Sequence, residues 1–219
     1  MVRGHGDWQE AIASALAAAS RPVGGDPRFA PRSAGSGDRA RWDRATFPPA
    51  RAASTLLLLY PNEAGELTIP LTVRHEALRT HAGEISLPGG AMDAADTSRE
   101  AAALREANEE IGLDPASCRI LGILDDIWIP VSNFELRPFV GATAARPDLR
   151  PQTDEVAEIV ELPVRLILTD EIVHEEEISG SGWSLRAAVY RHAGHRIWGA
   201  TARTLAMFAA VLAEAGLSD

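Results

Sequence analysis

Two apolar stretches in the second quarter of the chain predict a β-hairpin. Residues 54–60, STLLLLY, form a continuous apolar run, and residues 67–74, LTIPLTVR, form a second run rich in branched side chains. The intervening PNEAGE contains proline, asparagine and glycine, which are typical of turns. The second strand would carry Arg74 at its end, so we expect the hairpin to lead into a loop that can contact a ligand.

Further strand patterns and two helices follow along the rest of the chain. We expect strands in residues 118–130, 134–143 and 156–163, a short helix in 163–170, strands in 172–178, 183–192 and 195–201, and a final helix over 200–215. Asp125 and Asp126 interrupt the first of these strands, as at a bulge or an edge, and we expect them to be solvated, with metal binding as the alternative. This mixture of elements predicts an α/β fold without internal repeats.

The stretch between Gly90 and Gly112 predicts a helix that begins near Ser98. Thr97 and Glu100 have the spacing of a capping box, in which a hydroxyl and a carboxylate each accept a free backbone amide at the helix start. Gly112, followed closely by a proline, is a typical stop signal.

Three carboxylates lie close together on this helix. At about 100° per residue, Glu106, Glu109 and Glu110 fall within roughly 100° of one another. The core-facing side is expected to be a separate one, marked by Leu104, Ala107 and Ile111. Clustered carboxylates repel one another, and Mg²⁺, which prefers oxygen ligands, would relieve that conflict. The alternative is an ordinary solvated acidic face.

Residues around this helix favour the ligand-binding alternative. Arg105 can brace a carboxylate with its planar guanidinium. Gly89 and Gly90 lack side-chain bulk and would allow a backbone loop to approach a ligand. In the preceding loop, Arg74 and Arg79 are candidates for contacts with phosphate, with surface salt bridges as the alternative.

The N-terminal quarter differs in composition from the rest of the chain. Residues 7–19 have the pattern of an alanine-rich helix, whereas residues 21–49 are rich in glycine, proline, serine, arginine and aspartate. That composition is typical of a loop or a partly disordered arm. We therefore divide the chain into an N-terminal helix and flexible arm, residues 1–49, and one globular domain, residues 50–219.

Charge and cysteine content restrict the class of protein. The formal net charge of −10 argues against a general nucleic-acid-binding surface. We find no apolar run near eighteen residues and no signal-peptide pattern, so we expect a cytoplasmic protein that does not enter a membrane. The single Cys118 lies in an apolar strand pattern and is expected to be a buried structural thiol in a reducing compartment.

The acidic helix and its preceding loop resemble the signature of the Nudix hydrolase family. In that signature a glycine precedes a glutamate, and then come Arg-Glu, an apolar residue, any residue, Glu-Glu, any residue, Gly and an apolar residue. The second half is met by Arg105, Glu106, Ala107, Glu109, Glu110, Gly112 and Leu113. In the first half Arg105 comes one residue late relative to Gly90, and Asp96 is our substitute for the expected glutamate.

The preceding segment, residues 71–90, resembles an additional motif of the coenzyme A pyrophosphatase subgroup of that family. The match consists of Arg74, Arg79, Gly83 and Pro88-Gly89-Gly90, with His75 and Leu87 in place of the usual residues. Residues 198–202, WGATA, also resemble the C-terminal part of this subgroup. The likeness runs from about residue 50 to residue 215.

This resemblance implies a fold, a reaction and a cofactor. The fold would be a central mixed β-sheet between helices, and the reaction would be metal-dependent hydrolysis of a diphosphate linkage in a nucleoside diphosphate derivative. For the subgroup, the substrate is coenzyme A or a derivative, cleaved to 3′,5′-ADP and 4′-phosphopantetheine with Mg²⁺ or Mn²⁺. Alternatives are ADP-ribose, another nucleotide, or a non-catalytic nucleotide sensor. The partner would be a small molecule rather than a nucleic acid or a membrane, and a homodimer is left open.

The resemblance also implies roles for particular residues. Glu106 and Glu110 would be the first metal ligands, with Glu109 as a third ligand or a base and Arg105 holding the carboxylates. Glu155 matches a further catalytic acid that Nudix enzymes often supply, although an ordinary surface acid has the same pattern. The remaining candidates would contact substrate: Arg74, Arg79, His81, Gly89 and Gly90. His81 could equally serve to order its loop.

Overall fold

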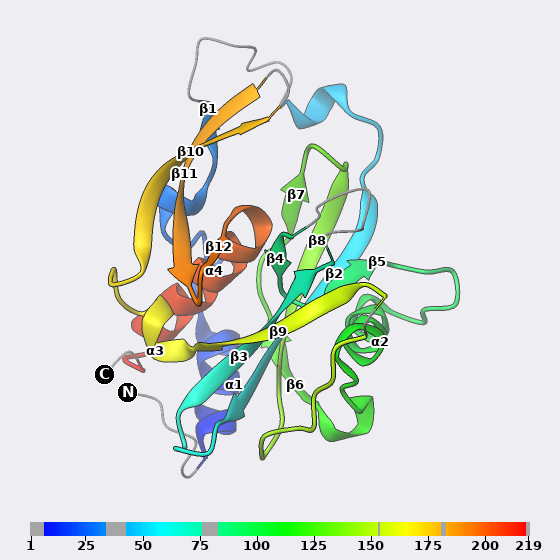
Figure 1. The fold of residues 1–219 in the computed structure, drawn as a ribbon, viewed down its shortest axis with the longest axis vertical. Coiled ribbons are helices and arrows are strands. Elements are labelled where there is room, and N and C mark those ends of the chain that lie inside the picture. Colours follow the sequence, from blue (N-terminus) through cyan, green and yellow to red (C-terminus); the bar gives the residue numbers. More distant parts are fainter. Residues whose placement is uncertain (1–6, 34–42, 76–82, 153, 181–182, 218–219) are drawn as a thin grey trace.

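A computed structural model describes residues 7–33, 43–75, 83–152, 154–180 and 183–217. Within these ranges the chain forms two β-sheets with helices around them (Figure 1). The helices are α1 (Trp8–Ala18), α2 (Arg99–Ile111), α3 (Val164–Ile167) and α4 (Gly199–Glu214), with short 3-10 turns η1 (Pro27–Phe29), η3 (Arg44–Thr46) and η4 (Pro115–Ser117). The strands are β1 (Arg32–Ser33), β2 (Arg51–Pro61), β3 (Leu67–Arg74), β4 (Ile85–Ser86), β5 (Gly89–Ala91), β6 (Arg119–Ile123), β7 (Ile127–Ile129), β8 (Phe134–Ala142), β9 (Val156–Pro163), β10 (Val173–Gly180), β11 (Trp183–His192) and β12 (His195–Ile197).

The large sheet is mixed, as the resemblance implied. Its main order is β4-β3-β2-β8-β6, with β5 and β7 pairing to β2 and β8 and with β9 pairing to β3. The β2–β8 pair is parallel, and the other described pairs are antiparallel. This confirms an α/β fold with a central mixed sheet and helices.

The expected hairpin of β2 and β3 is confirmed only near its turn. The two strands pair at Tyr60 with Thr68 and at Pro61 with Leu67. Beyond these pairs β2 continues along β8 and β5, whereas β3 continues along β9 and β4. The end of β3 that carries Arg74 therefore separates from β2.

The apolar run of β2 is explained by burial on both faces of the sheet. Leu57 and Leu59 belong to the main core, and Leu56 and Leu58 pack in a second cluster that includes α2. Because successive side chains of a strand point to opposite faces, a strand covered on both sides has no polar alternation.

The small sheet has the order β1-β11-β10, with β12 also paired to β11. Figure 1 shows this sheet and α4 beside the large sheet, with β12 close to β4. The expected final helix is confirmed as α4, which buries Leu205, Phe208 and Leu212 completely. The small sheet and α4 thus form a wall that faces the large sheet.

The described N-terminal residues pack against the same core. Trp8, Ile12 and Leu16 of α1 belong to the main hydrophobic cluster. The ring of Phe29 stacks on that of Tyr190 with centroids 4.4 Å apart. Strand β1 pairs with β11. The division of the chain at residue 49 stays an interpretation of composition.

Asp125 and Asp126 separate β6 from β7, as the sequence indicated, and both keep some contact with solvent while they pair with arginines. Asp125 accepts a hydrogen bond of 2.9 Å from Arg21. Asp126 accepts two bonds of 2.8 Å from Arg137 and one of 3.3 Å from Arg99. Arginines from three other parts of the chain pair with these acids, which adjacent residues in the sequence could not reveal.

No helix in the described part of the chain is both long enough and apolar enough to cross a membrane.

Candidate active site

Helix α2 begins one residue later than the capping box required. Ser98 is the N-cap, with extended backbone, and its hydroxyl accepts the amide of Ala101 at 3.0 Å. The capping box of Thr97 and Glu100 is therefore wrong, because Ser98 is the hydroxyl residue that directly precedes the first helical residue. The expected stop is confirmed at Gly112, which has φ +69°.

Two of the three clustered carboxylates of α2, Glu106 and Glu110, lie toward its buried side, and Glu109 is exposed. The side chain of Glu106 is 16% exposed, Glu110 is 5% exposed as a residue, and the side chain of Glu109 is 56% exposed. Ala103 and Ala107, close to them around the helix, are fully buried. The expected burial of Ala107 and Ile111 is confirmed, but the core side also includes Glu110, because the small Ala103 and Ala107 let α2 approach the sheet there.

Two glycines of β5 bring the backbone against these carboxylates. The amide of Gly89 donates to Oε2 of Glu110 at 3.3 Å. A Cβ atom at Gly90 would lie 2.6 Å from Oε1 of Glu106. β5 is held in this position by antiparallel pairing with β2. The missing side-chain bulk therefore serves close contact between the strand and the carboxylates.

Arg105 joins four groups around the exposed rim of the site. Its guanidinium donates to both carboxylate oxygens of Asp96, at 2.9 and 3.0 Å, and to the carbonyl of Ala91 at 3.2 Å. It also donates to Glu106 at 3.0 Å and to Glu109 at 2.8 Å. The hydrogen bonds to Asp96 raise the pKa of Arg105 and lower the pKa of Asp96. The structure therefore places Asp96 on Arg105 and Glu109 in the same network.

Burial and like charge oppose the ionisation of the Glu106 and Glu110 carboxyl groups. Burial, followed by the charge of Glu106, raises the pKa of Glu110 to about 8. Burial is also the main cause of the raised pKa of Glu106, which Arg105 opposes. The charge of Glu155 raises both values, and the charge of Arg74 lowers the pKa of Glu110. The structure thus brings Glu155 and Arg74 into the electrostatic range of the pair.

The donor set fits a divalent cation held by two carboxylates. In the described ranges, no three His, Cys, Asp or Glu side chains form a ready-made metal cage. Mg²⁺ typically uses one or two carboxylates and fills its remaining positions with waters and substrate phosphates. When ionised, Glu106 and Glu110 repel each other and lose contact with water. A bound cation would offset both the repulsion and the cost of burying the two charges. The Glu109 carboxylate would have to leave Arg105 to become a third ligand.

A large cleft of about 1800 Å³ lies between the two sheets. Its walls include Arg74, Gly89 and Gly90 from the sequence candidates. Gly89 contacts Glu110 and Gly90 lies against Glu106, so the carboxylate pair adjoins the cleft at these two glycines. The wall formed by the small sheet and α4 was missed from sequence, apart from the WGATA segment: it includes Arg196, Trp198, Gly199 and Arg203.

The other candidates have different positions. The Nε atom of Arg74 is buried without a hydrogen-bond partner. The carbonyl of Glu155 accepts the amide of His75 at 2.9 Å, which fixes the Glu155 backbone beside the end of β3. Arg79 and His81 lie outside the described residues, so their expected contacts with substrate stay predictions.

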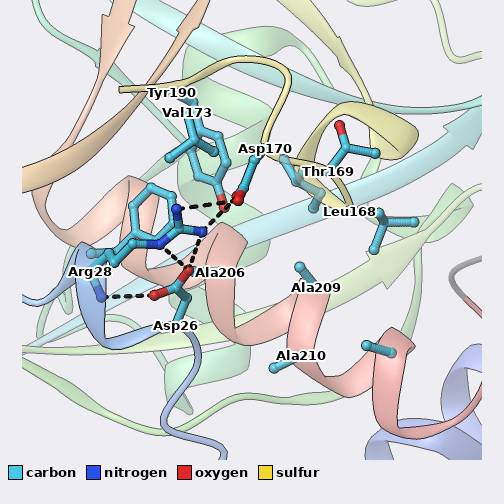
Figure 2. Close-up of a pocket in the computed structure, with 13 residues that line it drawn as sticks. Asp26, Arg28, Leu168, Thr169, Asp170, Val173, Tyr190, Ala206, Ala209 and Ala210 are labelled. Atoms are coloured by element: carbon cyan, nitrogen blue, oxygen red, sulfur yellow. Dashed lines mark hydrogen bonds and ion pairs between the residues drawn. The ribbon is translucent and has the colours of Figure 1, made fainter. Parts of the chain in front are cut away.

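A smaller cavity of about 450 Å³ lies between η1, α3 and α4 (Figure 2). Figure 2 shows Arg28 pointing between Asp26 and Asp170, to which it donates at 2.7 and 2.6 Å. Because two carboxylates already neutralise this arginine, the cavity does not offer an anion a free positive charge. The large cleft is the better candidate for a site that binds a phosphorylated ligand.

Comparison with known proteins identifies relatives over this region. The NUDIX domain family model matches residues 50–179. The chain is similar to an uncharacterized Nudix hydrolase, NudL, of Citrobacter koseri: 37% identity over 132 residues, 60% of this chain and 68% of that protein. The corresponding NudL protein of Pectobacterium atrosepticum is 44% identical over 97 residues, 44% of this chain and half of that protein.

Among solved structures, the chain is similar to a MutT/nudix family protein from Enterococcus faecalis. The TM-score is 0.47 and the sequence identity is 15%, with coverage of 79% of this chain and 68% of that chain. The Nudix hydrolase RenU of M. Smegmatis gives a TM-score of 0.43 at 23% identity, covering 54% of this chain and 73% of that chain.

Proposed function

The chain belongs to the Nudix hydrolase family, and we propose that it hydrolyses the diphosphate linkage of coenzyme A or a derivative. The products would be 3′,5′-ADP and 4′-phosphopantetheine. The observation that best supports hydrolysis is the mutually repelling, buried pair of Glu106 and Glu110 next to the cleft. The choice of coenzyme A depends on the motif of residues 71–90 and on the WGATA segment.

The carboxylates would hold Mg²⁺ or Mn²⁺. Glu106 and Glu110 are our first-choice ligands, and Glu109 would be a third ligand or the base that takes a proton from the attacking water. When bound, a divalent ion lowers the pKa of water and neutralises charge that develops on phosphate oxygens. The ion would also let Glu110 ionise in its buried position.

Other side chains would orient the carboxylates and the substrate. Arg105 fixes Glu106 and Glu109 through the hydrogen bonds described above. Glu155 would accept a proton from water or assist the metal site, since its charge already acts on Glu106 and Glu110. Arg74 would contact the diphosphate, because its buried Nε lacks a partner on the wall of the cleft.

A mass-spectrometric assay with coenzyme A and Mg²⁺ or Mn²⁺ tests this proposal. We expect masses of 3′,5′-ADP and 4′-phosphopantetheine, and faster turnover than with ADP-ribose or a nucleoside triphosphate. Faster cleavage of another compound would reject coenzyme A, and binding without turnover of any compound would indicate a non-catalytic sensor.

Substitutions on α2 and β3 test the assigned roles. Glu110→Gln should lower kcat by orders of magnitude and leave the fold intact, whereas Glu100→Gln on the exposed first turn of the same helix should not. Arg74→Ala should mainly raise KM, since it removes ground-state binding. Near-normal turnover of the Glu110 variant would reject its role as a ligand.

A further inference from the structure

Ion pairing divides the described arginines of this chain into two groups. Acidic residues exceed basic ones, 31 to 21, so carboxylates are available in excess. Most described arginines have a carboxylate within 4.0 Å, as Arg119 has Glu10 and Arg165 has Glu66. The described arginines without such a partner are Arg32, Arg51, Arg74, Arg186 and Arg203.

Three of these five, Arg32, Arg74 and Arg203, line the same large cleft. The two others have evident environments: Arg51 lies 4.1 Å from the ring centroid of Phe134, and Arg186 is exposed to solvent. The unpaired positive charges are therefore concentrated where an anionic ligand would enter.

Arg203 has no polar partner within the described part of the chain. Arg32 donates to the carbonyl of Pro27 at 3.3 Å, but Arg203 makes no hydrogen bond, ion pair or ring contact with any described residue. Its side chain is nevertheless half-buried. Its guanidinium nitrogens keep access to solvent on the wall of the cleft, where an anionic ligand would bind them without displacing a carboxylate.

Arg203 and Arg74 occupy different walls of the cleft. Arg74 ends β3 of the large sheet, near the carboxylate pair, whereas Arg203 belongs to α4. Figure 1 shows α4 beside the small sheet. At about 1800 Å³ the cleft exceeds the usual range for a small-molecule pocket, about 300–1,000 Å³. A diphosphate at Arg74 would leave most of this volume, including the wall with Arg203, for the rest of the substrate.

We infer that Arg203 determines specificity by binding a second anionic group of the substrate, a phosphate monoester separate from the scissile diphosphate. This inference rests on the proposed diphosphatase activity at the same cleft. In coenzyme A, the 3′-phosphate of the ribose is a group of this class. Arg203 favours substrates that carry such a phosphate over otherwise identical compounds that lack it.

A pair of substrates that differ by this one phosphate tests the inference. We expect the wild-type protein to have a KM for coenzyme A about tenfold or more below its KM for 3′-dephospho-coenzyme A. Arg203→Gln should raise the KM for coenzyme A about tenfold, leave the KM for the dephospho compound nearly unchanged, and preserve kcat. Arg203→Lys keeps the charge and should retain part of the preference.

Arg119→Gln is the control, because it removes an exposed arginine of β6 that does not line the cleft. It should leave both KM values unchanged. Equal KM values of the wild-type protein for the two substrates would overturn the inference without any variant. An equal rise of both values in Arg203→Gln would also overturn it, since a general structural defect would affect both substrates.

Binding measurements keep this test separate from the test of hydrolysis. If neither compound is cleaved, the proposed function fails, and calorimetry with adenosine 3′,5′-bisphosphate and AMP then decides the role of Arg203. Tighter binding of the bisphosphate that is lost in Arg203→Gln supports the inference. Equal affinity of the wild-type protein for the two nucleotides overturns it.

Discussion

Replacing Gly90 with alanine should disturb the carboxylate site and spare the fold. The new Cβ would lie 2.6 to 2.8 Å from the three terminal atoms of the Glu106 side chain. These atoms can move by rotation, so we expect a stability loss of only about 1 kcal/mol. For a domain of this size, that corresponds to a fall in Tm of roughly 2–4 °C. The carboxylate would be displaced by about 1 Å, which can cost about 100-fold in rate.

Gly89→Ala is the contrasting variant on the same strand. Its Cβ would lie 2.7 Å from the Cα of Thr55 and in closer contact with the carbonyl oxygen of Ser54. These are backbone atoms of β2, which cannot rotate away, so overpacking should cost about 3 kcal/mol. The expected fall in Tm is roughly 6–12 °C.

Thermal unfolding and kcat/KM, measured on both variants and the wild-type protein, separate the two effects. Gly90→Ala should lose activity out of proportion to its stability, and Gly89→Ala should lose stability. Wild-type kcat/KM in Gly90→Ala would show that the position of the Glu106 carboxylate does not limit the reaction. Equal losses of stability in the two variants would show that the Glu106 side chain is not the group that yields.

Three further predictions follow from burial in the structure. The pKa of Glu110 is raised from 4.5 to about 8. The metal-free fold therefore has its full stability from this group below about pH 4.5, where Glu110 is protonated in both the folded and the unfolded chain. Up to about 5 kcal/mol of the unfolding free energy is lost as the pH rises through 8. Urea unfolding with a chelator should show this loss, and in Glu110→Gln the curve should flatten. Burial also raises the pKa of Cys118 to about 11, so at pH 8 iodoacetamide should alkylate the native protein about 100-fold more slowly than the urea-unfolded chain, and equal rates would contradict this. Phe29→Ala removes a buried ring stacked on Tyr190 and should cost about 3–5 kcal/mol in urea unfolding, clearly more than Phe47→Ala at a partly exposed site; an unchanged midpoint would show that this segment does not stabilise the fold.

Local patterns were sufficient for most of the secondary structure. Residues 67–74 and 156–163 became β3 and β9 with the expected bounds, and Gly112 ends α2 in the left-handed conformation. These features depend on hydrophobic runs and on backbone preferences that neighbouring residues determine. The cap at Ser98 was displaced by one residue, since two adjacent hydroxyl residues offer the same local signal.

The relative burial of the acidic residues depended on tertiary packing. Helical spacing placed Glu106, Glu109 and Glu110 near one another but could not show which of them would lose water. The approach of α2 to β2 and β5 buries Glu106 and Glu110 and leaves Glu109 at the rim with Arg105. Only this arrangement produces the raised pKa values, because desolvation depends on atoms distant in the sequence.

The acidic helix, the glycine pair beside it and the family resemblance were evident from the amino-acid sequence, because these are local patterns of residue type and spacing. The packing of distant elements, in contrast, places a second sheet and α4 across the cleft from Arg74. Arg203 lies more than a hundred residues beyond Arg74 in the sequence. No local pattern could distinguish it from the arginines that pair with surface carboxylates, since pairing depends on which distant groups the fold brings within reach.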